Sequence, residues 1–304
     1  MKVCILGGCG FIGSNLAKSL IDDNHIVTVV DMECTEANTL QQLGVTVVKA
    51  DLTKNINNKV RDQLIKADII FHFASSVGVK LIDTDPHKHI CNMYELTNNL
   101  LPIFQMTSAR VIFASTSEVY GNNTNATEGD DLTIGDPQVL RWGYACNKLM
   151  TEFMLKSYKI NHTVVRFFNI TGVGQRPTSG MVLPSFVYNA KNNADITIYG
   201  NGKQIRSFCD IRDAIKMLKI IMHDNIHSGE TYNIGNQNNY TTIYDLASKV
   251  VKLIGSNSKI KYKQYSDEFT CESKDIMKRR ANTTKIEKLY KPRFSLDDII
   301  LSLL

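Results

Sequence analysis

The stretch Gly7-Gly8-Cys9-Gly10-Phe11-Ile12-Gly13 decides the fold of this 304-residue chain. It follows a short apolar run, residues 3–6, and it opens a segment with helical spacing, residues 12–21. The glycines at positions 7, 10 and 13 let the backbone turn tightly, approach a phosphate and pack the helix on the strand. The free N–H groups of the helix start attract an anion. The stretch therefore predicts a strand–turn–helix unit that binds a pyrophosphate.

Asp31 adds a second part of a dinucleotide site. It ends the next apolar run, residues 26–30, at about the spacing of 20 residues from the glycines that such sites show. A carboxylate there accepts hydrogen bonds from the adenosine ribose hydroxyls and repels a 2′-phosphate. Met32 and Glu33 follow it, and neither is basic. We therefore expect NAD, and not NADP, as the cofactor.

The first half of the chain alternates apolar runs with helical patterns. Strands are expected over residues 45–49, 69–73, 111–115 and 163–168, and helices over residues 59–66, 86–105 (interrupted near Pro102) and 144–158. Buried strands that alternate with helices predict an α/β fold with a doubly wound parallel Rossmann sheet. Beyond Asn169 the pattern loosens. We expect an NAD-binding Rossmann domain over residues 1–170 and a smaller α/β C-terminal substrate lobe over residues 171–304, interleaved with it.

Composition excludes several classes of protein. Hydrophobic residues make up 43% of the chain and charged residues 21%, which is enough apolar surface for a core. The net charge of +5 is spread along the chain, so a dedicated nucleic-acid binder is not expected. No run approaches the roughly 20 apolar residues of a membrane span. We expect no partnership with nucleic acid or membrane.

The number and spacing of the cysteines indicate the redox state of the cellular compartment. Seven are scattered along the chain without a CxxC pair. We expect buried free thiols in a reducing environment, and hence a cytoplasmic protein. The seven are Cys4, Cys9, Cys34, Cys91, Cys146, Cys209 and Cys271.

Hydroxyl and amino groups gather at a second place. Thr116 ends an apolar run that is expected to be a buried strand, and open α/β sheets bind ligands at that end. Tyr144 and Lys148 are four residues apart, so they share one face of a helix. A nearby ammonium and a cationic nicotinamide would lower the pKa of the phenol from about 10. Tyr144 would then take a proton from a substrate hydroxyl held by Thr116, while hydride leaves for NAD.

These motifs together resemble the extended short-chain dehydrogenase/reductase family, and in particular its NAD-dependent nucleotide-sugar epimerases, dehydratases and decarboxylases. The resemblance covers nearly the whole chain and is closest in motifs to UDP-glucuronate decarboxylases. Its main motifs are GGCGFIG at 7–13, FHFAS at 71–75, STSEVYG at 115–121, YACNK at 144–148, RFFN at 166–169 and YNIG at 232–235.

The resemblance implies roles for individual residues. The catalytic residues would be Thr116, Glu118, Tyr144 and Lys148. The cofactor would be bound by Gly7, Gly10, Phe11, Ile12, Gly13, Asp31, Asp51, Leu52, Phe73, Ala74, Ser75, Tyr144 and Lys148, with Asp51 and Leu52 beside the adenine. A nucleotide-diphosphate sugar would be bound by Ser117, Asn169, Arg206 and Arg279. The family also implies a homodimer formed through the long helix and the helix of Tyr144.

Glu118 bears on the reaction. Dehydratases and decarboxylases of the family carry Glu there, and the run of Arg141 and Trp142 before Tyr144 is similar to decarboxylases. A 4-ketone is β to the carboxyl group of glucuronate, so carbon dioxide can leave. We expect decarboxylation of UDP-glucuronate to a UDP-pentose, with 4,6-dehydration or 4-epimerisation as alternatives. Glu118 would orient the sugar or relay a proton, or else only fix its own loop, and Arg279 would hold the carboxylate or lie in a solvated basic run.

Two other interpretations are weighed. A non-catalytic NAD-binding scaffold is the remote alternative, because such relatives lose the tyrosine or lysine that this chain keeps. The histidines do not predict a metal site, because His87 and His89 do not share a helix face. They are expected at a solvated helix start, and His72 is expected in the core with a hydrogen-bonded ring.

Overall fold

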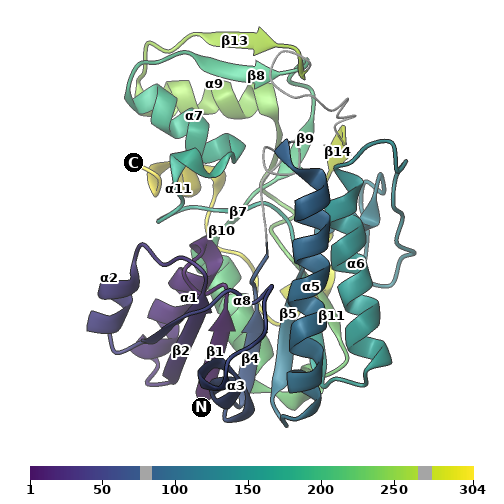
Figure 1. The fold of residues 1–304 in the computed structure, drawn as a ribbon. Helices are drawn as coiled ribbons and strands as arrows, with labels where there is room; N and C mark the ends of the chain where they lie inside the picture. The colour runs from purple at the N-terminus through teal and green to yellow at the C-terminus, as the bar shows by residue number, and fades with distance from the viewer. Residues whose placement is uncertain (76–83, 266–275) are drawn as a thin grey trace.

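The computed structural model describes residues 1–75, 84–265 and 276–304, and a seven-stranded parallel sheet lies at its centre (Figure 1). The strand order β11-β6-β5-β4-β1-β2-β3 reverses direction between β1 and β4. Ligands of open α/β sheets bind at such a switch point. The strands are β1 (Lys2–Leu6), β2 (Ile26–Asp31), β3 (Thr46–Lys49), β4 (Ile69–His72), β5 (Arg110–Thr116), β6 (His162–Phe167) and β11 (Thr231–Ile234).

Helices cover both faces of this sheet (Figure 1). Alternate residues of β1 supply two separate cores: Val3 and Ile5 pack with α1 and α8, while Cys4 and Leu6 pack with α3 and α5. This follows from the two-residue period of a strand. These helices and their neighbours are α1 (Phe11–Asp22), α2 (Ala37–Gln42), α3 (Asn58–Ile65), α5 (Pro86–Gln105), α6 (Trp142–Ser157) and α8 (Ile211–His223).

A smaller α/β lobe lies above the carboxyl ends of the strands (Figure 1). Its core contains Phe186, Ile198 and Leu246. It is built from α7 (Val182–Lys191), β8 (Ile196–Tyr199), α9 (Ile243–Ile254), β13 (Ile260–Lys263) and α11 (Leu296–Leu301). Short strands lie between the lobe and the main sheet: β7 (Ile170–Thr171), β9 (Ile205–Ser207), β10 (Cys209–Asp210), β12 (Tyr240–Thr242) and β14 (Lys278–Arg279). The doubly wound α/β prediction is thus confirmed, and the division of the domains at residue 170 stays a prediction.

Three local expectations are wrong. The helix α5 is not interrupted near Pro102, which lies inside it with its ring exposed. His72 is buried, as expected, but neither ring nitrogen has a hydrogen-bond partner among the described residues. His89 is not solvated: it is 2% exposed, because the residues of α5 at positions 89, 93 and 97 form one buried face.

The expectation of free thiols throughout is also wrong. Cys9 and Cys34 form a disulfide, since the turn after β1 and the segment after β2 bring their Cα atoms to 5.1 Å. Cys4 and Cys209 are buried free thiols, as predicted. Cys91 and Cys146 are free but not buried, and residue 271 lies outside the described residues.

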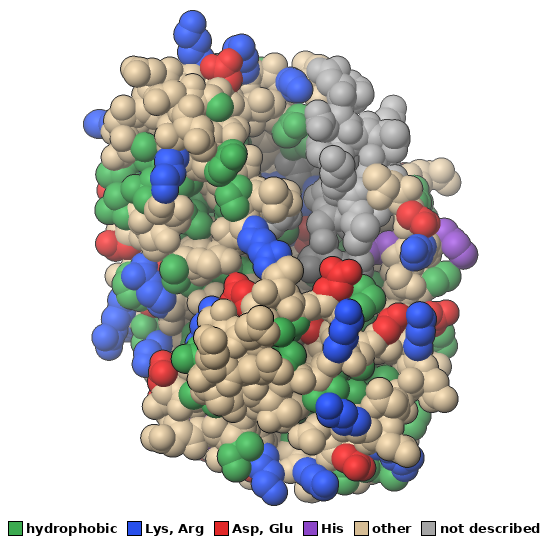
Figure 2. All heavy atoms as spheres, turned by 60° about the vertical axis from the view of Figure 1, so that its left-hand side comes forward, with side chains coloured by type: hydrophobic (Ala, Val, Ile, Leu, Met, Phe, Trp, Pro, Cys, Tyr) green, Lys and Arg blue, Asp and Glu red, His purple; other side chains and the backbone are tan. Residues whose placement is uncertain are grey.

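The charge distribution on the surface and the apolarity of the helices concern binding to nucleic acid and to membranes. Acidic and basic side chains are intermixed over the face in Figure 2. Within the part of the chain that the structure describes, no helix combines the length and apolarity that crossing a bilayer requires.

Candidate active site

The glycine turn lies between β1 and α1, pressed against the end of β4. Gly7 has φ +77°, and a Cβ there would lie 2.5 Å from the backbone nitrogen of Ala74. A Cβ on Gly13 would lie 2.5 Å from the carbonyl oxygen of Gly7. Gly10 begins α1 in an extended conformation, and no side chain caps the helix there. Only glycine fits at positions 7 and 13. The first N–H groups of α1, at Phe11 and Ile12, are of the kind that binds an anion.

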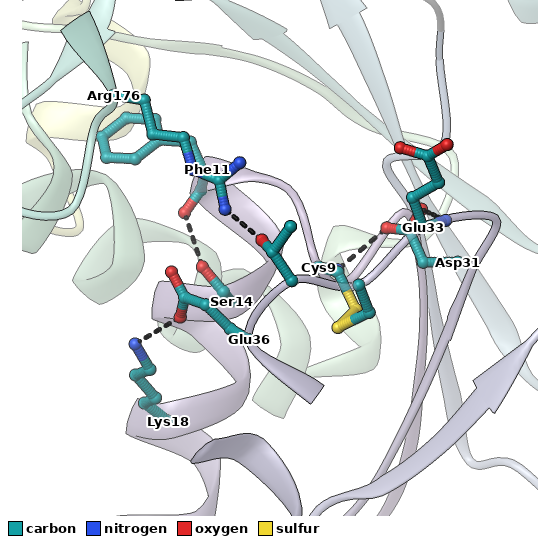
Figure 3. Close-up of a disulfide and its surroundings, with 10 residues drawn as sticks. Cys9, Phe11, Ser14, Lys18, Asp31, Glu33, Glu36 and Arg176 are labelled. Atoms are coloured by element: carbon teal, nitrogen blue, oxygen red, sulfur yellow. Dashed lines mark hydrogen bonds and ion pairs between the residues drawn. A yellow bond between two sulfur atoms is a disulfide. The ribbon is translucent and has the colours of Figure 1, made fainter. Parts of the chain in front are cut away.

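Asp31 lies beside this turn. The N–H group of Cys9 donates to Asp31 Oδ2 at 2.9 Å, and that of Glu33 donates to Oδ1 at 3.4 Å (Figure 3). Burial raises the pKa of this carboxyl, and the backbone hydrogen bonds oppose the rise. The structure therefore places a half-buried carboxylate next to the glycine turn, as the sequence predicts.

Asp51 and Leu52 follow β3, at the adenine end of the predicted site. Asp51 accepts hydrogen bonds from the N–H and hydroxyl groups of Thr53 at 3.0 and 2.7 Å. The bond from the Thr53 hydroxyl is the largest cause that lowers the pKa of Asp51. A cavity of about 200 Å³ opens beside Asp51, lined also by Ile56 and Val60. Leu52 is buried and does not line that cavity. This cavity lies beyond the end of β3, away from the helix of Tyr144.

Thr116, Tyr144 and Ser75 come together from three elements. Thr116 ends β5, Tyr144 lies in the first turn of α6, and Ser75 follows β4 after Phe73 and Ala74. The hydroxyl groups of Thr116 and Ser75 lie close enough to Tyr144 to lower its pKa, but burial, and after it the charge of Glu118, raise the pKa well above its usual range. The predicted cluster of hydroxyl groups is therefore formed.

Lys148 lies one helical turn after Tyr144 and is 2% exposed. Its Nζ donates to the carbonyl oxygen of Ala114 at 2.8 Å and lies 5.9 Å from the centroid of the Tyr144 ring. Burial lowers the pKa of this lysine to about 7. The chain's own groups therefore raise the pKa of Tyr144. The expected lowering, which also requires the positive charge of the nicotinamide, stays a prediction.

Glu118 is held by two arginines. Its Oε1 lies 3.0 Å from Nη2 of Arg141 and 3.0 Å from Nη1 of Arg279. Burial opposes ionisation, but the charges of both arginines lower the pKa of Glu118 to about 2. The carboxylate is thus ionised and fixed at neutral pH, which suits orientation better than proton transfer. The sequence contained Arg141 only as part of a motif, since the contact with Glu118 requires the fold.

Arg279 and Arg206 lie on neighbouring strands. Arg279 of β14 is paired with Arg206 of β9 in a parallel register, and both are less than a tenth exposed. Arg279 Nη1 also lies 3.4 Å from Ser117 Oγ. Its Nε is buried and has no hydrogen-bond partner within the described ranges. Arg279 is therefore not part of a solvated surface run.

Asn169 lies at the other side of β9. Its backbone has φ +38°, and its Nδ2 donates to the carbonyl oxygen of Ser207 at 2.8 Å. Arg206 Nη1 donates to the carbonyl oxygen of Ile205 at 2.9 Å. Asn169 thus contacts the end of β9, the strand that carries Arg206. Arg279, on the neighbouring strand β14, lies with Ser117 and Glu118 nearer Tyr144.

His89 is a site neighbour that the sequence did not indicate as one. Its ring centroid lies 6.1 Å from that of Tyr144, and both ring nitrogens are buried without a partner among the described residues. Burial, and after it the charge of Lys148, lowers its pKa. The repeat of buried positions 89, 93 and 97 is the signal that could have placed it inside.

Comparison with known proteins gives the family. Residues 3–235 match the NAD dependent epimerase/dehydratase family. The chain belongs to this family. It is 32% identical to the UDP-N-acetyl-alpha-D-glucosaminuronate decarboxylase of Bacillus cytotoxicus, over 95% of this chain and 91% of that protein. It is 30% identical to the UDP-glucuronic acid decarboxylase 1 of Danio rerio, over 95% of this chain and 67% of that protein.

Two solved structures have the same fold. Pal from Bacillus thuringiensis has a TM-score of 0.86 at 26% identity, with 100% of this chain and 97% of that chain covered. The UDP-glucuronic acid 4-epimerase from Bacillus cereus, solved with UDP-glucuronic acid and NAD, has a TM-score of 0.85 at 24% identity, with 99% and 97% covered. The chain is therefore an NAD-dependent enzyme of the epimerase/dehydratase family, and its glycine turn and Asp31 fit that cofactor.

Proposed function

We propose that this enzyme decarboxylates a UDP-hexuronate through a 4-keto intermediate, with UDP-glucuronate as the first candidate and a UDP-pentose as the product. The observation that carries the proposal is the position of Arg279. Its guanidinium is bound to Glu118 and Ser117. Its charge lowers the pKa of Tyr144. Its Nε is buried and has no hydrogen-bond partner among the described residues. A guanidinium in this position suits a substrate carboxylate next to the reacting carbon.

The cofactor contacts are proposed from the geometry around the glycine turn. Gly7, Gly10, Gly13 and the N–H groups of Phe11 and Ile12 would bind the pyrophosphate, and Asp31 the adenosine ribose. Asp51 and Leu52 would lie near the adenine. The residues proposed at the nicotinamide end are Phe73, Ala74, Ser75, Tyr144 and Lys148. Bound NAD supplies the hydride acceptor at the start of the reaction and the hydride donor at its end.

Tyr144 and Thr116 would handle the proton of the C4 hydroxyl. Thr116 lies close enough to Tyr144 to lower its pKa, so a sugar hydroxyl bound between the two side chains would meet both. Tyr144 takes the proton as C4 becomes a carbonyl, and it returns the proton at the end. Lys148, with a pKa of about 7, is the adjacent cation whose protonated form favours the phenolate.

Loss of carbon dioxide follows from the position of the carbonyl. The C4 ketone is β to the C5 carboxylate, so the bond between C5 and the carboxyl carbon breaks and its electron pair forms an enolate. A proton from solvent then returns to C5. Arg279 would hold the carboxylate, Glu118 would hold Arg279, and Ser117 would contact both. Asn169 and Arg206 would bind the diphosphate.

The pKa of Glu118 weighs against dehydration. In a 4,6-dehydratase this residue would remove the C5 proton, but a carboxylate with a pKa of about 2 is a weak base. A 4-epimerase would keep the carboxylate and is the remaining alternative. An N-acetylated hexuronate is a second candidate substrate, because the relative from Bacillus cytotoxicus that is named for one is covered over 91% of its length.

A homodimer is proposed from exposed apolar side chains on α5 and α6. Tyr94 is 51% exposed, Met150 48% and Phe153 64%. These helices pack side by side, so their outer faces form one surface. Sedimentation equilibrium would give twice the chain mass, and a monomer at micromolar concentration would contradict the proposal.

We also propose the division into residues 1–170 and 171–304, and a cytoplasmic location. The division follows the change from the regular strand–helix alternation to the short strands beyond Asn169. The contribution of β11 and α8 to the first domain supports the interleaving. The free thiols of Cys4, Cys91, Cys146 and Cys209 are the basis for a reducing compartment, and the disulfide between Cys9 and Cys34 counts against it.

The reaction is tested by incubating the purified enzyme with UDP-glucuronate, UDP-N-acetylglucosaminuronate and UDP-glucose and reading the products by NMR. Loss of the carboxyl carbon as carbon dioxide from one of the two uronates, with a five-carbon sugar ring left on UDP, supports the proposal. A C4 epimer that keeps its carboxylate, or a 4-keto-6-deoxy sugar from UDP-glucose, contradicts it.

A further inference from the structure

The disulfide between Cys9 and Cys34 lies within the cofactor site. Cys9 is part of the glycine turn, and Cys34 is three residues beyond Asp31. The backbone of Cys9 also donates to Asp31 Oδ2, so the same residue is tied to the end of β2 twice (Figure 3). The crosslink therefore joins the two segments that bind the pyrophosphate and the ribose of a dinucleotide.

The segment after Asp31 has two other attachments. Glu36 Oε2 accepts a hydrogen bond from Lys18 Nζ at 2.9 Å, and Thr35 accepts one from Arg176 (Figure 3). Lys18 belongs to α1, and Arg176 precedes α7 of the smaller lobe. Both of these contacts are polar and lie at partly exposed side chains, so they are individually weak. The covalent link is the strongest constraint on residues 32–36.

Both sulfur-bearing residues are within reach of solvent. Cys9 and Cys34 are partly buried and pack at the edge of the core, whereas the thiols of Cys4 and Cys209 are fully buried. Burial raises the pKa of the Cys4 thiol to about 12, which suppresses its reactivity. Among the described cysteines that are not buried, Cys9 and Cys34 are joined in the disulfide of the cofactor site, whereas Cys91 and Cys146 are free thiols on α5 and α6.

We propose that Cys9 and Cys34 form a reversible redox site that controls the affinity of the enzyme for NAD, with the disulfide as the tight-binding state. The oxidised pair holds residues 32–36 and Asp31 in place against the glycine turn. After reduction these residues must be ordered by the cofactor itself. Ordering the backbone of one residue costs about 1–2 kcal/mol, which corresponds to about tenfold in affinity.

The redox step is an ordinary thiol–disulfide exchange. A dithiol such as dithiothreitol attacks the bond between the two sulfurs and forms a mixed disulfide, and its second thiol then displaces the remaining protein sulfur. Cys9 and Cys34 gain two electrons and two protons, and the reagent becomes a cyclic disulfide. Oxidised glutathione reverses the change and leaves as two reduced molecules.

The test measures NADH binding by fluorescence titration, after bound nucleotide has been removed, in oxidised glutathione and in dithiothreitol. No sugar is present, so the result is independent of the reaction proposed above. The oxidised enzyme is expected to bind NADH about tenfold more tightly than the reduced enzyme. The Cys34→Ser variant should bind with the weaker affinity in both conditions, while Cys146→Ser should keep the wild-type response.

Two further measurements keep the proposal falsifiable. Mass spectrometry of the oxidised enzyme should give a crosslinked peptide pair containing Cys9 and Cys34, and hydrogen exchange at residues 32–36 should be slower in the oxidised state. Equal NADH affinity in both states when the crosslink is present, or tighter binding after reduction, would overturn the proposal. So would absence of the crosslinked peptides under oxidising conditions.

Discussion

Glu118 and Arg279, 161 residues apart in the chain, are joined by an ion pair of 3.0 Å beside the hydroxyl groups of Thr116 and Tyr144. The pair connects the short helix after β5 to the two-residue strand β14. Arg141 approaches the same carboxylate oxygen at 3.0 Å from the start of α6, and its helix also carries Tyr144. Tyr144, the proposed proton-transfer group, and Arg279, the proposed carboxylate-binding group, are thus linked through Glu118.

Replacement of Arg279 tests whether it recognises a carboxylate. In Arg279→Gln, the KM for UDP-glucuronate should rise about 10- to 100-fold, because a charge-assisted hydrogen bond contributes about 1.5–3 kcal/mol. The Kd for UDP-glucose, which has no carboxylate, should change less than threefold. Arg280→Gln is the matched control, because Arg280 lies over the ring of Tyr240 at 4.0 Å. Equal losses for both ligands would show that Arg279 only supports the fold.

Replacement of Glu118 tests its charge. Its pKa is lowered from 4.5 to about 2 in the folded state, so its contribution to stability is complete above pH 4.5 and is lost as the pH falls towards 2. At neutral pH, wild type should exceed Glu118→Gln in free energy of unfolding by about 3 kcal/mol. Urea denaturation between pH 7 and pH 3 should show this difference shrink below pH 4.5. A difference that stays constant would contradict an ionised, paired carboxylate.

Replacement of Tyr144 separates chemistry from folding. Tyr144→Phe keeps the ring and loses the hydroxyl, so kcat should fall 10²- to 10⁴-fold, as expected when a general acid–base group is removed. The melting temperature should change by less than about 2 °C, the shift that 1 kcal/mol gives in a chain of this size. Tyr188→Phe, at a residue 54% exposed on α7, is the control and should retain full activity. Comparable activity of the two variants would remove Tyr144 from the mechanism.

Replacement of Lys148 has a pH signature. Burial lowers its pKa from 10.5 to about 7, so the folded state binds fewer protons than the unfolded state between these values, and wild-type stability rises with pH there. The stability of Lys148→Met relative to wild type should therefore be greatest near pH 6.5 and should decline towards pH 10. Thermal unfolding across that range measures it, with Lys156→Met in the last turn of α6 as the control. A relative stability without pH dependence would mean that the lysine is not desolvated.

The sheet and the glycine turn could be predicted from the sequence because their signals are local. Short apolar runs indicate the strands, and a Cβ added at Gly7 or Gly13 would lie 2.5 Å from backbone atoms, which leaves no room for another residue. Tyr144 and Lys148 were found because their spacing places them on one helix face. The apolar run before Thr116 is also a local signal, and it correctly predicted that Thr116 ends a buried strand.

The contacts that the sequence missed depend on distance in space. The disulfide joins residues 25 apart whose approach is set by the pairing of β1 with β2. Arg206 and Arg279 are adjacent only because β9 and β14 pair. Pro102 lies within α5 and is exposed there. The local rule that proline breaks a helix therefore gave the wrong expectation at this position. The low pKa of Lys148 results from burial, which spacing alone does not reveal.

The central claim is that a C4 ketone forms and drives loss of the neighbouring carboxylate. Its most direct test is the reaction of UDP-glucuronate, and in parallel of UDP-N-acetylglucosaminuronate, in D₂O, followed by NMR of the pentose product. The account predicts one deuterium at C5, where the enolate is protonated by solvent, and protium at C4, where the original hydride returns. Deuterium at C4, or a product of either uronate that keeps its carboxyl carbon, would contradict it.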